Sequence, residues 1–181
     1  MSDVSDAVVV RRARADDPTD RAGLVEVVVD CVDGGASIGF LQPFGPERAG
    51  AFWDGELAAA GRGERVLLVA EDPATGAVVG TVQVVVAAPE NQPHRGEITK
   101  MLVHRRARRR GVGERLMRAA EAAALGAGKT LLTLDTASPD AERLYDRLGW
   151  RRVGVIPDYA LWPDGRPVDT LVLYKALTGS P

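Results

Sequence analysis

The stretch between residues 97 and 136 constrains the fold most, because it reads as strand, glycine loop, helix and strand in succession. Residues 97–104 read Glu-Ile-Thr-Lys-Met-Leu-Val-His, which is typical of a strand. Residues 112–125 place apolar side chains at helical spacing, and residues 131–136 are again typical of a strand. A helix between two neighbouring strands predicts a parallel crossover inside a mixed sheet.

The flanking segments predict the remaining strands and helices. We expect strands over residues 8–13, 65–71, 77–87, 150–156 and 170–175, and helices over residues 19–31, 47–60 and 138–148. Two of the helix starts are well marked, because Asp17 and Ser138 each precede a proline that suits the first helical turn. A loop with Pro157, Pro163, Gly165 and Pro167 is expected between the last two strands. The predicted order is β-α-α-β-β-β-α-β-α-β-β.

Length and composition fit one globular domain. The chain has 181 residues, 45% apolar and 27% charged, with a net charge of −2, and at this length roughly 70% of the unfolded surface can be buried. We expect a single domain over residues 1–181, with a core at about residues 8–176 and short flexible termini. Cys31 is the sole cysteine, which excludes an internal disulfide and favours a reducing compartment.

The same features bear on location. No apolar run approaches the ~20 residues that span a bilayer, and the acidic start Met-Ser-Asp-Val-Ser-Asp lacks the layout of a signal peptide. We therefore expect a cytoplasmic protein with no membrane partner. The near-neutral charge balance also argues against a dedicated nucleic-acid binder.

The loop before the central helix predicts an anion site. Gly111 and Gly113 permit unusual backbone angles and close approach of a ligand to the main chain. They stand at a helix start, where free N–H groups and the helix dipole favour phosphate. Five arginines between residues 105 and 110 add positive charge. The implied ligand is a polyphosphate that is held mainly by main-chain groups.

Two common phosphate motifs do not fit. Gly128-Lys129-Thr130 matches the end of a nucleoside triphosphate P-loop, but Ala123 replaces its first glycine and a helix precedes it where a P-loop requires a strand. The dinucleotide fingerprint is also incomplete, because Leu116 replaces its third glycine. The ligand is therefore expected to be another diphosphate-bearing compound.

The pattern Arg-x-x-Gly-x-Gly after Met-Leu-Val-His resembles the acyl-CoA loop of the GNAT N-acetyltransferases. The later run Ala-Glu-Arg-Leu-Tyr-Asp-Arg-Leu-Gly-Trp at residues 141–150 resembles the family's second motif. Leu-Asp-Thr at 134–136 through Ile-Pro-Asp-Tyr-Ala at 156–160 is similar to the subgroup that includes tabtoxin resistance proteins, which acetylate an amino group of a small antimicrobial metabolite. The resemblance covers most of the chain.

This resemblance implies an α/β (α+β), GNAT-like fold, with a mixed, mostly antiparallel central sheet of about seven strands flanked by about four helices. It also implies an N-acetyltransferase that moves an acetyl group from acetyl-CoA to a primary amine of a small molecule, by direct attack in a ternary complex. Acetyl-CoA is then the cosubstrate and no metal is needed.

The resemblance places the cofactor on the predicted fourth strand and the loop that follows. In the family this strand bulges and splays from its neighbour, which would free main-chain groups of residues 101–103 for the pantetheine arm. Ser138 stands where many members have asparagine, and it either holds the cofactor arm or only caps the helix. The expected cofactor-binding residues are Met101, Leu102, Val103, Arg108, Arg109, Arg110, Gly111, Val112, Gly113, Glu114 and Ser138.

Three residues are candidates for the chemistry. The resemblance makes Tyr145 the general acid that protonates the leaving thiolate, although its helical spacing with Leu144 and Leu148 equally fits a core residue. Glu97 and Asp135 are candidate bases, because carboxylates at strand positions need a cleft, a partner or solvent. A solvated strand end for Glu97 and a cap or ion pair for Asp135 are the alternatives. His94 and His104 are weaker candidates.

The acceptor pocket is expected between the first helix-to-helix loop and the last strand loop, and its candidate lining residues are Asp33, Phe40, Tyr159 and Trp162. The expected partner is a small-molecule amine, with no nucleic acid and no membrane, and the protein is expected to be a monomer or homodimer. A protein N-acetyltransferase, a non-catalytic acyl-CoA sensor and a nucleic-acid module built on residues 105–110 are the alternatives. The last would lack the aromatic side chains that stack on bases.

Overall fold

The computed structural model describes residues 8–177, and all seven strands belong to one sheet. The elements are β1 (Val9–Arg12), α1 (Pro18–Asp33), α2 (Pro46–Gly61), β2 (Arg65–Glu71), β3 (Val78–Val85), β4 (Arg95–Val103), η2 (Arg105–Ala107), α3 (Val112–Gly126), β5 (Leu131–Thr136), α4 (Pro139–Arg147), β6 (Arg151–Leu161) and β7 (Pro167–Ala176). The sheet order is β1-β2-β3-β4-β5-β7-β6. Only the β4–β5 pair is parallel among the described strands. The predicted mixed, mostly antiparallel fold is confirmed, while the expected flexible termini lie outside the described residues.

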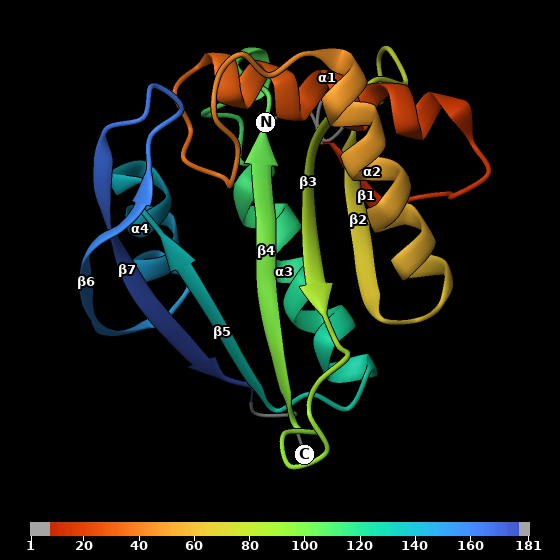
Figure 1. Cartoon of the computed structure of the whole chain (residues 1–181). Helices are drawn as coiled ribbons and strands as arrows, with labels where there is room; N and C mark the ends of the chain where they lie inside the picture. The colour runs from red at the N-terminus through yellow and green to blue at the C-terminus, as the bar shows by residue number, and fades with distance from the viewer. Residues whose placement is uncertain (1–7, 178–181) are drawn as a thin grey trace, which may run out of the picture.

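The helices cover the sheet from both sides. Helices α1 and α2 lie on one face and α3 and α4 lie on the other (Figure 1). Each face has its own apolar cluster: Leu24, Trp53 and Leu102 belong to the α1–α2 side, and Ile98 and Leu116 belong to the α3–α4 side. The predicted cap at Asp17 is present, since its carboxylate accepts the Thr19 N–H at 2.8 Å. None of the helices in the described range is long and apolar enough to cross a membrane.

The last two strands are longer than the sequence predicted. Strand β6 runs on through Pro157 to Leu161, and β7 begins at Pro167, so the predicted loop from Pro157 onward is wrong for most of its length. Proline is tolerated there because β6 is an edge strand with a neighbour on one side only. The register of β6 against β7 also shifts between Ile156 and Ala160, which absorbs the irregularity.

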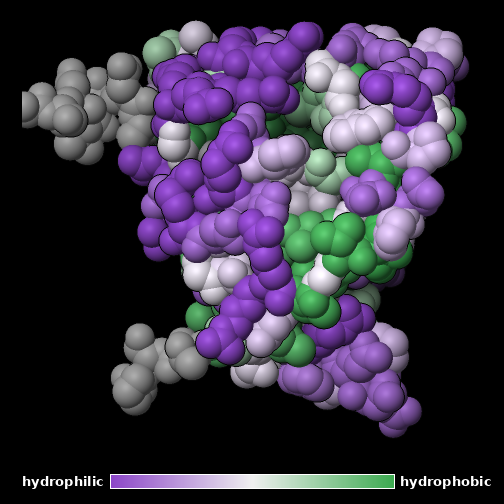
Figure 2. Space-filling model, turned by 90° about the vertical axis from the view of Figure 1, so that its left-hand side faces the viewer, coloured by the Kyte–Doolittle hydropathy of each residue, from purple (hydrophilic) through white to green (hydrophobic). Residues whose placement is uncertain are grey.

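Strand β6 leaves apolar side chains in solvent. The exposed large apolar residues on it are Val153, Val155, Ile156, Tyr159 and Leu161. Figure 2, viewed from that side of the molecule, shows the apolar surface in the middle of the face. The alternating burial of a half-covered strand is therefore missing from β6, whose residues are exposed at nearly every position.

Candidate functional site

The sheet opens between β4 and β5. These two strands pair over only three positions, from Arg95 with Leu131 to Glu97 with Thr133. Beyond that point β4 continues along β3 and β5 continues along β7, so the two strands diverge (Figure 1). The divergence leaves the edge of β4 after Glu97 without a strand partner on the β5 side. The splay that the resemblance implied is thus a feature of this fold.

A bulge lies in β4 at the same level. Thr81 of β3 pairs with Leu102 and Gln83 pairs with Thr99, so Val82 alone faces two residues of β4. Those two residues are Lys100 and Met101, and Lys100 has a φ of 49°. A bulge aims main-chain groups away from the regular ladder. It therefore combines with the splay to free main-chain donors and acceptors at residues 100–103.

The loop between β4 and α3 changes character at Arg109. The N–H groups of residues 105–108 all have acceptors, namely Asp30, His104 and the carbonyls of His104 and Arg105. From Arg109 to Glu114, no acceptor for a main-chain N–H is present within residues 8–177. Gly111 holds a left-handed φ of 74° and directly precedes α3. The result is a row of free donors at a positive helix end, which is the arrangement that binds phosphate groups.

Gly113 is closely packed. A Cβ atom there would lie 3.0 Å from Leu144 Cδ2, so α4 approaches the start of α3 closely. Gly111 is different, because a Cβ atom there would meet nothing within 4 Å. Glycine is therefore needed at the two positions for different reasons. At Gly113 it allows α3 and α4 to pack closely, and at Gly111 it allows the left-handed turn.

The arginine run carries less free charge than its composition suggests. Most of its side chains are directed to oxygens of this chain, and the contacts are Arg105 with Asp30, Arg106 with Glu26, Arg108 with the Val103 carbonyl and Arg110 with Asp72. Arg109 stands apart, since its side chain is 85% exposed and its closest carboxylate oxygen, on Asp140, is 4.0 Å away. Local ion pairing therefore leaves Arg109 as the most weakly paired cation of this run.

Tyr145 lies on the inner face of α4, next to the opening. Its ring is buried and packs against Trp150, with 6.0 Å between ring centroids. Its hydroxyl forms no hydrogen bond with any residue of the described chain. Burial, together with the negative charge of Asp135, raises the pKa of the Tyr145 phenol well above its usual range. The phenol therefore stays protonated at neutral pH.

The two candidate carboxylates occupy the same face of the splay. Glu97 is half-buried and sits at the last paired position of β4 and β5. Asp135 is exposed two residues farther along β5, and it accepts a hydrogen bond from the Thr170 hydroxyl at 3.1 Å. The negative charge of Asp135 also acts on the pKa of both Tyr145 and Lys100. The alternative of an ion pair between Asp135 and an arginine is not present among residues 8–177.

The two histidines and Ser138 form hydrogen bonds in the turns and caps around the splay. His104 caps the η2 turn, because its Nδ1 accepts the Arg106 N–H at 3.2 Å. His94 is exposed on the loop before β4, and its carbonyl accepts the N–H groups of Thr130 and Leu131. Ser138 caps α4, with its hydroxyl accepting the Ala141 N–H at 3.3 Å. The capping alternative for Ser138 is therefore present in the fold.

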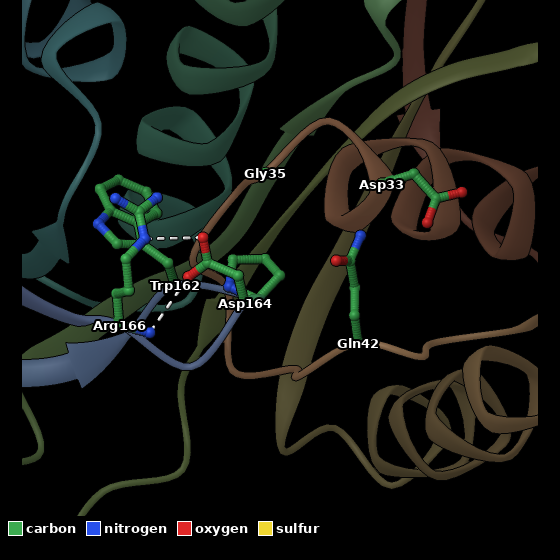
Figure 3. Close-up of a pocket in the computed structure, with 7 residues that line it drawn as sticks. Asp33, Gly35, Gln42, Trp162, Asp164 and Arg166 are labelled. Carbon is green, nitrogen blue, oxygen red and sulfur yellow. Dashed lines mark hydrogen bonds and ion pairs between the residues drawn. The ribbon is translucent and has the colours of Figure 1, made fainter.

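Two loops meet above the splay. The Ser37 hydroxyl donates to the Leu161 carbonyl at 2.8 Å, and the Gln42 N–H donates to the Pro163 carbonyl at 2.9 Å. These bonds tie the α1–α2 loop to the β6–β7 turn. A cavity of about 340 Å³ lies between them, with Asp33 and Gln42 on one side and Trp162, Asp164 and Arg166 on the other (Figure 3). Tyr145, Glu97 and Asp135 do not line it.

The four expected acceptor-site residues separate into groups. Asp33 and Trp162 line the cavity. Phe40 lies deeper, stacked on Phe44 with 4.2 Å between ring centroids. Tyr159 is 56% exposed on the edge strand and does not line the cavity. The structure therefore brings only Asp33 and Trp162 together at the cavity, while Tyr159 stands apart on β6, which extends farther than the sequence indicated.

One residue of the site was missed in the sequence. Lys100 Nζ lies 5.8 Å from the ring centroid of Phe40 and 5.6 Å from that of Phe52, so the α1–α2 segment covers it. Its burial lowers the pKa of the Lys100 ammonium. A lysine in a strand gives no sequence signal by itself, and only the bulge brings it to this face. Nowhere in residues 8–177 do three or more His, Cys, Asp or Glu side chains gather into a group that could hold a metal ion.

Comparison with known proteins gives a consistent result. Residues 36–150 match the sequence model of the Acetyltransferase (GNAT) family. The structure is similar to that of yncA from Salmonella typhimurium with its cofactor acetyl-CoA, at 21% identity and a TM-score of 0.76 over 97% of this chain and 96% of that one. It is also similar to a GNAT superfamily phosphinothricin acetyltransferase from Sinorhizobium meliloti in complex with AcCoA, at 20% identity and a TM-score of 0.77 over 94% and 89%. A GCN5-related N-acetyltransferase from Kribbella flavida gives 23% identity and a TM-score of 0.77 over 94% and 98%.

Proposed function

The chain belongs to the GNAT acetyltransferase family, and on that premise we propose that it transfers the acetyl group of acetyl-CoA to a primary amine of a small molecule. Transfer proceeds by direct attack in a ternary complex. The observation that carries the proposal is the row of free N–H groups from Arg109 to Glu114, which lies directly after the strand whose edge is open. A diphosphate bound at this row directs the attached arm along β4 into the splay.

The residues fit the cosubstrate at both ends. Acetyl-CoA supplies an acetyl thioester, and its diphosphate suits six consecutive N–H donors at a helix start. Gly113 keeps the start of α3 free of a side chain, and Arg109 adds an exposed guanidinium. Main-chain groups at the bulge of β4 are available to polarise the carbonyl, and one donor aimed at a developing oxyanion contributes roughly 3 kcal/mol.

Proton transfer involves both sides of the splay. The acceptor amine must lose a proton to become a nucleophile, and Glu97 and Asp135 are the carboxylates on the face where it would enter. As the new N–C bond forms and the C–S bond breaks, the thiolate takes up a proton. Tyr145 is suited to supply it, because its buried phenol is protonated and has no competing hydrogen-bond partner within the described range.

The tie between the two loops favours a small acceptor. The hydrogen bonds from Ser37 and Gln42 hold the α1–α2 loop against the β6–β7 turn, which narrows the front of the splay. The depression of about 340 Å³ between the two loops lies at this narrowed front, and we propose that it is where a metabolite-sized acceptor enters. The likeness to a phosphinothricin acetyltransferase agrees with the small amino compound that the tabtoxin-like pattern suggests.

The assay that tests this function measures free thiol release from acetyl-CoA against a panel of small amines, including β-lactam amino acids. We expect turnover with at least one member of the panel and a heat of binding when coenzyme A is titrated. Binding without turnover on any amine would indicate an acyl-CoA sensor. Turnover only on peptides or proteins would indicate a protein N-acetyltransferase, and absence of coenzyme A binding would contradict the proposal altogether.

A pH–rate profile distinguishes which of the two carboxylates, Glu97 or Asp135, is the general base. Glu97→Gln and Asp135→Asn each remove a proton acceptor while keeping the shape of the side chain. We expect the variant that removes the base to lower kcat/KM by about 10²-fold and to shift the rising limb of the profile to higher pH. The other variant serves as the matched control. A profile that neither change alters would assign deprotonation to His94 or to bulk water.

A further inference from the structure

Lys100 is a cation without an oxygen partner. Across residues 8–177, no hydrogen bond from its Nζ and no carboxylate within 4.0 Å of it is found. The other two lysines differ, since Lys129 donates to the Pro93 carbonyl at 2.7 Å and Lys175 donates to Glu121 at 2.7 Å. A half-buried ammonium normally finds such a partner, because leaving it unpaired costs free energy.

The bulge puts Lys100 in this position. Side chains alternate along a strand, so residues 98, 100 and 102 of a regular β4 would share one face. Ile98 instead packs in the cluster on the α3 side and Leu102 packs in the cluster on the α1–α2 side. The face changes at the bulge, and Lys100 reaches Phe40 and Phe52 on the α1–α2 side. An unbulged strand would direct it into the apolar core under α3.

Further donors without acceptors lie beside it on the same side of the sheet. Gln83 of β3 pairs with Thr99, next to Lys100, and its buried Nε2 has no acceptor. Arg65 of β2 bonds Glu56 and the Gln83 Oε1, and its buried Nε is likewise unsatisfied. The neighbourhood of Lys100 is therefore short of oxygen atoms, and the sole carboxylate bonded within it already serves Arg65.

Charges of opposite sign lie across the splay. Four ionised groups act on Lys100: Glu56 from α2, Asp135 from β5, Arg65 from β2 and Glu97 from β4 itself. Glu97 and Asp135 lie toward β5, while Lys100 is covered by Phe40 and Phe52. The splay thus presents carboxylates toward β5 and an ammonium toward α2.

We propose that Lys100 determines acceptor specificity by binding a carboxylate of the acceptor, so that the enzyme acts on zwitterionic amino acids. The inference rests on the proposed function and narrows its substrate class. The acceptor's ammonium is held toward Asp135 and Glu97, where it loses its proton. Its carboxylate accepts from Lys100 Nζ, and its apolar part packs on Phe40 and Phe52. A polycationic amine, which lacks the carboxylate, is repelled by Lys100.

The test compares matched acceptors on two variants. Each probe set consists of an L-amino acid, its carboxamide and the amine that lacks the carboxyl group, assayed by thiol release. With the wild-type protein, we expect the amino acid to have the highest kcat/KM of its set. Lys100→Met is expected to lower the ratio of kcat/KM for acid over amide by roughly 10-fold to 100-fold, chiefly through KM, because a charged hydrogen bond is lost. Lys100→Arg is expected to retain most of the preference.

Coenzyme A titration of all three proteins separates this inference from the proposed function. Equal affinity shows that the fold and the cosubstrate site are intact, and methionine is as unbranched as lysine at the strained φ of position 100. The inference is overturned if the wild-type protein binds coenzyme A but acetylates no carboxylate-bearing amine, or if Lys100→Met leaves the ratio unchanged. An acetyl group found on Lys100 after incubation with acetyl-CoA alone would also overturn it, by making that amine an acceptor. Loss of coenzyme A binding in the wild-type protein would instead contradict the proposed function.

Discussion

Gly111→Val is expected to weaken coenzyme A binding at least tenfold while leaving the fold intact. Gly111 has a φ of 74°, a conformation that costs an L-residue roughly 1–2 kcal/mol and a β-branched one more. Since nothing packs against this position, the valine variant relaxes its turn in the free protein and must be strained again to present its N–H groups. At 1.4 kcal/mol for each tenfold change, Kd rises by about tenfold or more. Calorimetric titration with coenzyme A measures it.

Gly111→Asn is the matched control, because asparagine tolerates the left-handed region. We expect its Kd to stay within a few-fold of the wild-type value. Gly113 is less suitable for this test, since any side chain there would press on Leu144 and disturb the contact between α3 and α4. Wild-type affinity in Gly111→Val, with melting temperature also unchanged, would show that this turn does not bind the diphosphate.

Tyr145→Phe is expected to lower kcat by about 10²-fold or more with little change in the Kd of coenzyme A. The ring stays in place against Trp150, and the hydroxyl that is removed has no hydrogen-bond partner within residues 8–177. Stability should therefore change little, while the leaving thiolate loses its proton donor. Steady-state kinetics, calorimetry and thermal unfolding on the same variant distinguish these effects.

Tyr174→Phe provides the comparison, because it removes a hydroxyl from β7 at a position that has no proposed role. Its kcat is expected to match that of the wild-type protein. Should Tyr145→Phe turn over at the wild-type rate, Tyr145 would be a core residue, as its spacing with Leu144 and Leu148 also allows. A large fall in melting temperature would lead to the same assignment.

Much of the fold follows from local sequence signals. The caps at Asp17 and Ser138 were recognisable because each needs only a side-chain oxygen, a proline and a helical repeat. The turn at Gly111 was recognisable because few residues other than glycine adopt its φ. The end of β6 was mispredicted because Pro157 usually interrupts a strand, and its acceptance depends on the edge position in the sheet.

The candidate site likewise combines residues that local sequence signals indicate and residues that only the tertiary structure brings into place. Glu97, Asp135 and Tyr145 could be predicted as candidates because polar groups at strand positions and a tyrosine in a family-like motif are apparent in the amino-acid sequence. Lys100 was missed, because nothing in Thr-Lys-Met-Leu shows that the strand bulges. Tyr159 is predicted to line the acceptor pocket, whereas the structure places it on the exposed edge strand β6, away from the cavity that Asp33 and Trp162 line.

The amino-acid sequence by itself determined the order of helices and strands and the glycine turn before α3, because periodicity, capping and backbone freedom act over a few neighbouring residues. The tertiary structure alone decided that β4 parts from β5 after Glu97 and that Lys100 faces Phe40 and Phe52. Both depend on which residues pair across strands distant in sequence. Such pairing arises from the packing of the whole sheet, and no short stretch of the chain encodes it.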